Sequence, residues 1–325
     1  METIDLRDGL TVDRLIQNPM SGDGPAISML VDGLDRHTRR DLRKEEIAIA
    51  APFHEGPRWP YVALTFGCFA IWLAFFPLAY YHQLNLATAC VASCFFCAYG
   101  YLTAHEAMHS NIARAGSKNR WLNEAVGWVS NFPIVFPFSM ARMMHLRHHS
   151  HCNDPLQDPD YSDDAPNALR AWYMTWYNRQ PGVDGSIHHY KRILGEMGTP
   201  EAKAVMRHTI IMQLFFMTCL FTMAWNGYAI EAALVWWLPR HIGLSYTRFF
   251  LSWAPHFPRH ERKGRYGNTR VFRSKVGYLA SMGMEYHVIH HLYPNILIHR
   301  NRAAFQAMRE ILVARGVDCS PIPKV

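Results

Sequence analysis

Long uncharged stretches alternate with polar segments along the 325-residue chain. Residues 61–81 form a run of 21 positions without a charged side chain, and residues 84–103 form another of 20. A helix rising 1.5 Å per residue needs about 20 residues to cross the ~30 Å hydrocarbon core of a bilayer. Only His82 and Gln83 separate the two runs. The pattern therefore predicts a transmembrane helical hairpin rather than a buried hairpin of a soluble bundle.

A second pair of apolar stretches follows later in the chain. Residues 209–225 are apolar except for Gln213, and Asn226 and Gly227 predict a turn. Residues 228–255 are long and aromatic, but the stretch is interrupted by Glu231, Arg240, His241 and Arg248. Charged groups are costly in lipid unless they face the protein or the interface. We expect a fourth span here, with limits that the pattern does not define.

A shorter apolar stretch, residues 121–139, lies between the two pairs. Glu124 and two prolines, Pro133 and Pro137, interrupt it. A straight span is therefore disfavoured, and we predict a re-entrant or interface-lying segment. Residues 1–58 are polar and contain glycine and proline, which indicates an N-terminal arm. No apolar cleavable segment precedes residue 61, so we expect no secretory signal peptide.

Lysine and arginine positions predict the orientation of the spans. They gather before the first span, after the second and after the expected fourth, whereas the short loops at residues 82–83 and 226–227 contain none. The positive-inside rule then places both termini and the long polar segments in the cytoplasm. The net charge of +7 is explained by this topology and by lipid headgroups, so we expect no nucleic-acid partner. Five of the seven cysteines lie inside the apolar stretches, where they favour packing over a disulfide framework.

Eleven of the 19 histidines fall in four short windows: HEAMH (105–109), HLRHHSH (145–151), PHFPRH (255–260) and HVIHH (287–291). Residues three and four apart share one face of a helix. Each of the first, second and fourth windows can therefore present several imidazoles in one direction. With the topology above, all four windows meet on one side of the membrane, as a single metal site requires.

The number of imidazoles separates two interpretations of HEAMH. As His-Glu-x-x-His it fits a zinc protease, with Glu106 as general base. A catalytic zinc takes three protein ligands, however, and the windows offer eight or nine imidazoles. That number suits two ions in an open site. Imidazole alone does not select among iron, zinc, copper and nickel.

The windows HEAMH, HLRHH and HVIHH, in this order and with two spans between the second and third, resemble the three histidine boxes of the membrane fatty acid desaturases and related hydroxylases. The similarity runs from about residue 61 to residue 300 and includes NDPLQDPD, WAPHFP and YHVIHHLYPNI. NDPLQDPD and GRYGNTR are also similar to the desaturase-like carotenoid ring hydroxylases. Ser252 departs from an acyl-CoA branch of the family, which has asparagine four residues before its additional histidine.

The resemblance implies an all-α integral membrane protein of about four transmembrane helices with a cytoplasmic, histidine-rich helical cap. It divides the chain into an N-terminal arm (1–58), a desaturase-like membrane domain (59–310) and a C-terminal tail (311–325). Two iron ions are the implied cofactor. Carried over position by position, their ligands are His105, His109, His145, His148, His149, His256, His287, His290 and His291.

Several other polar residues receive secondary roles. His151 and His260 remain outside the implied ligand set. Asp158 and Asp160 are candidates to accept hydrogen bonds from ligating imidazoles, although a solvated acidic loop explains them equally well. Glu106 becomes a supporting neighbour of the metal or a partner of an arginine such as Arg142 or Arg147.

The implied activity is oxygen-dependent desaturation or hydroxylation of an unactivated C–H bond in a lipid acyl chain. An external electron carrier of ferredoxin-like or cytochrome type is implied, because the chain contains no recognisable haem or cysteine-cluster domain. Carotenoid ring hydroxylation is the main alternative. A membrane zinc protease and a metal transporter are more remote, since the histidines are too many for one zinc and gather on one membrane side.

Overall fold

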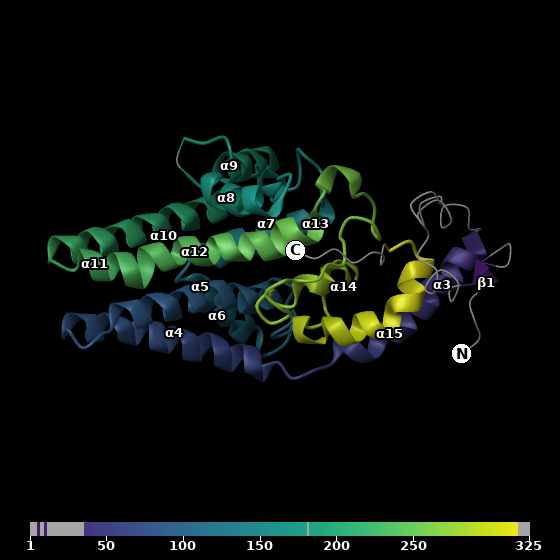
Figure 1. Ribbon diagram of the computed structural model, residues 1–325, viewed down its shortest axis with the longest axis horizontal. Helices are drawn as coiled ribbons and strands as arrows, with labels where there is room; N and C mark the ends of the chain where they lie inside the picture. Colours follow the sequence, from purple (N-terminus) through teal and green to yellow (C-terminus); the bar gives the residue numbers. More distant parts are fainter. Residues whose placement is uncertain (1–4, 7–9, 12–35, 181, 318–325) are drawn as a thin grey trace. The chain divides into compact units, whose positions relative to one another are not determined.

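The computed structural model of the protein describes residues 5–6, 10–11, 36–180 and 182–317 (Figure 1). Contacts divide the chain into two units. The long-helix unit comprises residues 57–253, and the two-segment unit combines residues 1–56 with residues 254–325. Helices form nearly all regular structure of the described residues. The exception is an antiparallel pair of two-residue strands, β1 (Asp5–Leu6) and β2 (Leu10–Thr11).

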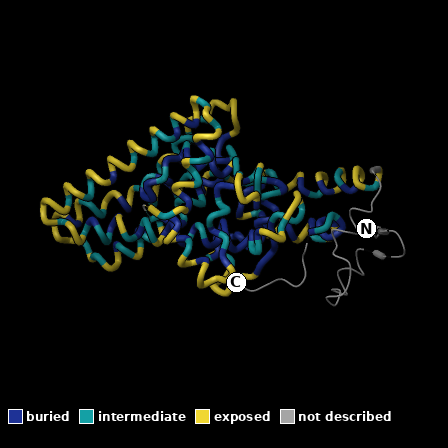
Figure 2. The backbone as a smooth tube through the Cα atoms, turned by 90° about the horizontal axis from the view of Figure 1, so that it is seen from above, coloured by how far each residue is buried: buried dark blue, intermediate teal, exposed yellow. Residues whose placement is uncertain are grey.

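Three helices of the long-helix unit are long and apolar enough to cross a membrane: α4 (Trp59–Tyr80), α5 (Leu86–Met108) and α10 (Pro200–Trp225). These candidate spans match the predicted helical hairpin and the third predicted span in position. The side chain of Asn85 caps α5 by accepting a hydrogen bond from the Thr88 amide. Thr199 caps α10 in the same way, so this helix begins nine residues before the uncharged run. Exposed residues follow the outer turns of these helices (Figure 2).

Residues 229–253, where a fourth span is predicted, are helical throughout. They comprise α11 (Ala229–Ala232), the π-helical η3 (Ala233–Trp237), α12 (Leu238–Thr247) and the π-helical η4 (Arg248–Trp253). No part of this stretch is among the three helices that meet the length and hydropathy of a crossing. Its buried guanidinium groups have protein partners. Arg240 Nε donates to the Ile134 carbonyl at 2.9 Å, and Arg248 pairs with Asp163 at 2.8 Å.

The segment after α5 turns back among the long helices. α6 (Arg120–Asn131) ends in a turn whose residues Phe132 and Val135 pack against Trp72 of α4, Phe216 of α10 and Trp236 of η3. Trp236 Nε1 also donates to the Pro133 carbonyl at 2.9 Å. The two prolines thus end the helix at mid-length of its neighbours, and α7 (Phe138–Ser150) leads away. This packing agrees with the re-entrant alternative.

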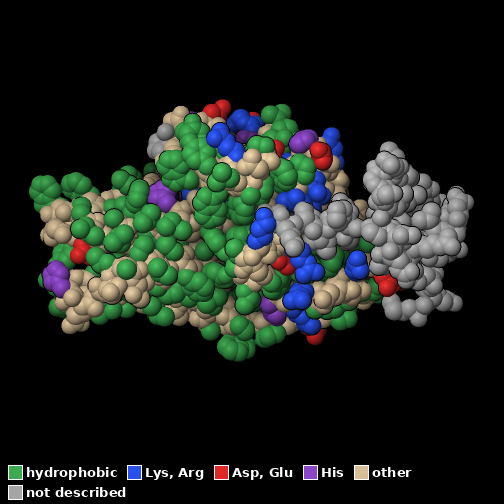
Figure 3. Space-filling model, in the orientation of Figure 1, with side chains coloured by type: hydrophobic (Ala, Val, Ile, Leu, Met, Phe, Trp, Pro, Cys, Tyr) green, Lys and Arg blue, Asp and Glu red, His purple; other side chains and the backbone are tan. Residues whose placement is uncertain are grey.

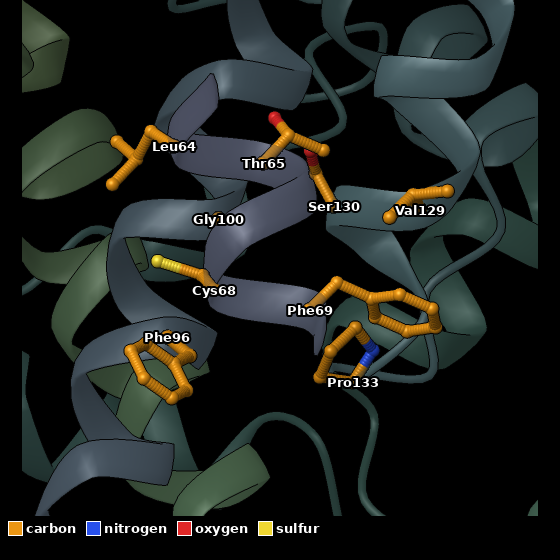
Figure 4. A pocket seen from close by; sticks show the side chains of 9 residues that line it. All are labelled: Leu64, Thr65, Cys68, Phe69, Phe96, Gly100, Val129, Ser130 and Pro133. Carbon is orange, nitrogen blue, oxygen red and sulfur yellow. The ribbon is translucent and has the colours of Figure 1, made fainter. Parts of the chain in front are cut away.

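Small and hydroxyl side chains join α4, α5 and α6. The hydroxyl groups of Thr65, Thr103 and Ser130 lie 2.7 to 3.1 Å from one another. Thr65 and Ser130 also line a small lateral pocket, together with Cys68, Phe69, Phe96 and Pro133 (Figure 4). Such interhelical hydrogen bonds and close approaches are typical of helix packing in lipid.

Hydrophobic side chains dominate the surface of the long helices. They cover most of the visible face around α4, α10 and α11 (Figure 3). On α10 the exposed residues include Ile210, Leu214, Phe215 and Phe221. A soluble protein seldom leaves such a continuous apolar surface in water. The remaining elements of the unit are η2 (Tyr161–Asp163), α8 (Ala168–Tyr177) and α9 (Ser186–Met197).

The two-segment unit has its own core. It contains α3 (Arg36–Ala50), η1 (Ala51–His54), α13 (Ala254–His256), η5 (Arg259–Glu261), η6 (Met284–Tyr286), α14 (His287–Leu292), η7 (Ile298–Arg300) and α15 (Asn301–Ala314). Leu42, Ile289 and Phe305 represent a core that joins α3, α14 and α15. The expected N-terminal arm lies mostly outside the described residues, and so does the expected tail beyond residue 317. The described end of the arm packs on α15.

Candidate metal centre

Four imidazoles from α5 and α7 converge inside the long-helix unit. His105 lies fully buried in the last turn of α5, and His109 follows at its end. His109 Nε2 lies 2.8 Å from His145 Nε2, and His149 Nε2 lies 3.1 Å from the same atom. One nitrogen each of His105, His109 and His145 falls within 4.8 Å of the other two. Ring nitrogens that lie this close together can bind one metal ion as its ligands.

A buried carboxylate orients the fifth imidazole of this unit. His148 Nδ1 lies 2.8 Å from Asp158 Oδ1, and both side chains are buried. The backbone amides of Asn153 and Asp160 donate to the same carboxylate at 2.8 and 2.9 Å. A carboxylate held in this way fixes the ring with its proton on Nδ1, so the lone pair of Nε2 is directed away from Asp158. The expected hydrogen bond between Asp158 and an imidazole of the histidine boxes is therefore observed.

The two-segment unit gathers a second set of imidazoles. His256 is the last residue of α13, whereas His287, His290 and His291 lie on α14. The ring centroid of His256 lies 5.3 Å from that of His287 and 4.9 Å from that of His291. His256 Nδ1 lies 3.0 Å from the Asn268 carbonyl oxygen, to which it donates. The proton of His256 is thereby held on Nδ1, which leaves the lone pair on Nε2, as in His148.

Burial keeps two imidazoles of the first set, His109 and His145, neutral near pH 7. It lowers the pKa of His109 to about 4. The pKa of His145 falls well below its usual range, first because of burial and then because of the neighbouring imidazoles. Only the neutral ring has a nitrogen lone pair to give to a metal. His109 and His145 are therefore in the protonation state that metal binding requires.

The other candidates named from the sequence lie elsewhere. His151 Nδ1 lies 2.9 Å from Ser150 Oγ at the end of α7, and His260 is exposed beside Glu261. Asp160 accepts a hydrogen bond from Tyr190 at 3.2 Å. The side chain of Asn111 donates to Glu106 at 2.6 Å.

The suggested pairing of Glu106 with an arginine is wrong for both arginines that the sequence offered. Arg142 pairs with Glu124 at 2.7 Å, and Arg147 donates to Gln157. Glu124 lies on the neighbouring α6, so this ion pair forms between helices that the sequence does not show to be adjacent.

Three features of the site were missed from the sequence. The Asn268 carbonyl acts through its backbone, which no side-chain pattern reveals. The pair of Arg248 and Asp163 joins residues 85 positions apart. Cys152, whose Sγ lies within 4.8 Å of a His148 nitrogen, follows that histidine by four residues and lies in the turn after α7, and this short spacing was available as a signal.

The donor set defines the chemistry that the site supports. It consists of imidazoles, and two of them, His148 and His256, are oriented by the hydrogen bonds that their Nδ1 atoms donate. Imidazole suits the ions of iron, zinc, copper and nickel, whereas calcium and magnesium prefer oxygen ligands. The residues present therefore fit iron.

Comparisons with known proteins give two kinds of match. The family model described as fatty acid desaturase matches residues 81–323. An sn-1 oleoyl-lipid 12-desaturase of Picosynechococcus is 27% identical over 137 residues, which cover 40% of this chain and 37% of that protein. An enzyme of the same name from Synechocystis is 32% identical over 97 residues, covering 28% of this chain and 26% of its own. A zeaxanthin 4-ketolase of Chlamydomonas reinhardtii is 35% identical over 74 residues, covering 22% and 16%. The matched segments thus span well under half of each of these relatives.

Proposed function

Because the chain belongs to the fatty acid desaturase family, whose members are oxidoreductases, we propose that it is an oxygen-dependent di-iron enzyme. Its substrate is the acyl chain of a membrane lipid, and it attacks an unactivated C–H bond of that chain as a desaturase or a hydroxylase. The observation that carries the proposal is the convergence of His105, His109, His145 and His149 beside the Asp158-held His148. The catalytic domain comprises residues 59–310, between an N-terminal arm (1–58) and a tail (311–325).

Nine histidines hold two iron ions in this proposal. Five come from the long-helix unit and four from the two-segment unit: His105, His109, His145, His148, His149, His256, His287, His290 and His291. When bound, the irons supply the oxygen activation and hydrogen abstraction of the reaction.

The protein residues supply orientation and a dry environment. Asp158 and the Asn268 carbonyl keep the protons of His148 and His256 on Nδ1, so Nε2 faces the metal. Burial of His105 and His145 keeps bulk water away from the reacting centre. In the proposal, the electrons that oxygen reduction needs come from an external carrier of ferredoxin-like or cytochrome type.

The membrane arrangement completes the proposal. The helix of residues 229–253 is the fourth span, and the histidines form part of a cytoplasmic cap. Both termini lie on that side. Two observations support the span: it follows α10 after a short turn, and its arginines have buried partners. The sidedness rests on the lysine and arginine residues that flank the spans.

Carotenoid ring modification is the second candidate function. The segment similar to zeaxanthin 4-ketolase supports it, because that relative is named for a carotenoid substrate. Both activities use the same metal chemistry, so the site residues do not distinguish them. Identification of the substrate, an acyl chain or a carotenoid, decides between the two functions.

The decisive experiment profiles the lipids and carotenoids of cells that express the protein in a host supplied with both. A new double bond or hydroxyl group in acyl chains supports the main proposal, whereas a modified carotenoid with unchanged acyl chains supports the second. His149→Ala should abolish the new product. His151→Ala is the matched control, because His151 lies two residues away but contacts Ser150, and it should retain activity.

Metal analysis of the purified active protein tests the cofactor independently. We expect two irons per chain, and His149→Ala should lower this number. One zinc per chain, together with proteolytic activity lost on mutation of Glu106, would overturn the proposal in favour of a zinc protease.

A further inference from the structure

Helix α8 (Ala168–Tyr177) has large apolar side chains on its exposed side and small residues on its buried side, which is the reverse of a surface helix in a soluble protein. Its buried side carries the small residues Ala171 and Thr175. Its outward side carries apolar and aromatic residues, namely Leu169, Trp172, Tyr173, Trp176 and Tyr177, and Leu169 is 84% exposed. Arg170 is the one charged residue of the helix, and its guanidinium lies over the Tyr173 ring at 5.1 Å. A water-facing helix normally shows the reverse pattern.

The contacts of α8 fix its level along the neighbouring helix. The Trp172 ring centroid lies 6.2 Å from that of Tyr246 and 5.6 Å from that of Phe249. Arg179, just after α8, donates to Ser245 Oγ at 2.9 Å and to the His241 carbonyl at 3.2 Å. The helix is therefore held against α12 and η4, whereas its aromatic side remains uncovered by described residues.

That level corresponds to the edge of a bilayer. The helix of residues 229–253 begins at Ala229, next to the end of α10. Tyr246 lies 17 residues further, or about 26 Å at 1.5 Å per residue. A hydrocarbon core is ~30 Å thick, so a span that starts at one surface reaches the other near Tyr246 and Phe249. Trp and Tyr are enriched at this depth because their rings are apolar and their polar atoms bind headgroups and water.

We propose that α8 is an interfacial helix that lies in the plane of the membrane, with Leu169, Trp172 and Trp176 inserted among the glycerol and upper acyl groups. The occupant of its aromatic side is the lipid bilayer, continuous with the apolar surface of α10. Arg170 extends from the edge of this side to lipid phosphates. The depth argument rests on the fourth span of the proposed function.

Photolabelling with lipids tests the placement. The full-length protein is reconstituted in phosphatidylcholine–phosphatidylglycerol vesicles with a phospholipid that carries a diazirine either near the glycerol or at the acyl chain end. Labelled peptides are mapped by mass spectrometry. The glycerol-level probe should label residues 168–177 at least five-fold more than α15, a helix with a polar exposed side. The chain-end probe should label α10 and not α8.

Two outcomes would overturn the inference while leaving the proposed function intact. One is labelling of α10 with no labelling of α8 by either probe, and the other is cross-linking of α8 to α8 of a second copy. Labelling of neither α8 nor α10 would reject the membrane arrangement itself, and with it the proposed function.

A pair of leucine variants gives a matched control. Leu169→Glu places a charge in the proposed lipid contact and should reduce glycerol-level labelling of α8 at least three-fold. The variant should fold, because the side chain is almost fully exposed. Leu156 is 63% exposed in the loop after α7, and Leu156→Glu should leave the labelling unchanged. Equal labelling of both variants and the parent would contradict the inference.

Discussion

At the scale of single residues, Asp158 is the side chain that most directly controls a proposed metal ligand. It is fully buried and accepts three hydrogen bonds, one of them from His148. Asp158→Asn keeps the shape of the side chain, but its amide NH2 group would face one of the three groups that now donate a hydrogen bond to Asp158. Loss of such an orienting carboxylate typically costs 10- to 100-fold in metal affinity or activity, and we expect about that loss of iron affinity.

Iron content and activity of purified Asp158→Asn, measured beside thermal stability, check this expectation. Asp164→Asn is the control, because Asp164 lies in the same acidic loop and should leave iron binding unchanged. A variant with normal iron affinity would show that Asp158 only supports the loop.

A second residue-scale prediction concerns the buried ion pair of Arg248 and Asp163. Arg248 Nε and Nη2 contact the two carboxylate oxygens at 3.0 and 2.8 Å, and the Asp163 side chain is fully buried. Removal of one partner leaves a buried charge, which typically costs 3–5 kcal/mol of unfolding free energy, so Asp163→Leu should lose about 3 kcal/mol. The double variant with Arg248→Met should recover part of this loss.

Unfolding in detergent, followed by tryptophan fluorescence, measures the four corners of this cycle. The exposed pair of Arg192 and Glu196 serves as reference, since Glu196→Ala should change stability by less than about 1 kcal/mol. Equal effects at the two sites would be inconsistent with a buried, charged pair.

At the scale of elements, α5 and α12 approach each other closely at Gly243. A Cβ atom added at Gly243 would meet Cys97 Cβ at 2.4 Å and the Ala98 nitrogen at 3.0 Å. Gly243→Ala should therefore push the helices apart and cost about 1–3 kcal/mol. Gly67 of α4 has no atom within 4 Å of its added Cβ, so Gly67→Ala should be neutral or stabilising by up to about 1 kcal/mol. Unfolding of the two variants side by side gives the measurement, and equal destabilisation would refute the close packing.

Helix α3 is joined to the region of the third histidine box by one carboxylate. Glu46 is fully buried and accepts hydrogen bonds from Tyr293 at 2.6 Å and Tyr266 at 2.7 Å, and it pairs with Arg43 and Arg315. Glu46→Gln removes the charge that both arginines face, so we expect a loss of about 3 kcal/mol. Glu45→Gln, one residue away and exposed, should have little effect. The loss should appear as faster hydrogen exchange of the α3 backbone amides in Glu46→Gln. An unchanged exchange rate in this variant would contradict the prediction.

The sequence predicted elements well where their own residues decide the outcome. Uncharged runs of sufficient length predicted α4 and α5, and the spacing of three and four placed His145, His148 and His149 on one helix. The limits of the predicted fourth span were harder to define because the partners of Arg240 and Arg248 lie 106 and 85 residues away. The choice between Asp158 and Asp160 depended on the shape of one loop. Pairings across the chain are set by tertiary packing, which no local pattern contains.

At the scale of the whole molecule, the proposed ligands divide between the two contact units. One unit supplies His105 to His149, and the other supplies His256 to His291. Neither unit contains the complete set, whereas hydrophobic cores are present in both. Hydrophobic packing thus accounts for the fold of each unit without a metal, and the proposed iron centre would need residues of both units.

Iron should consequently protect both units against local opening. A ligand that binds only the native state stabilises it by about 2.7 kcal/mol at a concentration of 100 Kd, which corresponds to roughly 100-fold slower exchange through openings that release the ligand. We expect chelation to speed amide exchange in α7 and α14 together, whereas α4, which carries no proposed ligand, should change little. Hydrogen exchange of the iron-loaded and chelated protein, read by mass spectrometry, makes the comparison. Protection confined to α7 would restrict the metal centre to the long-helix unit and reduce the ligand set to five histidines.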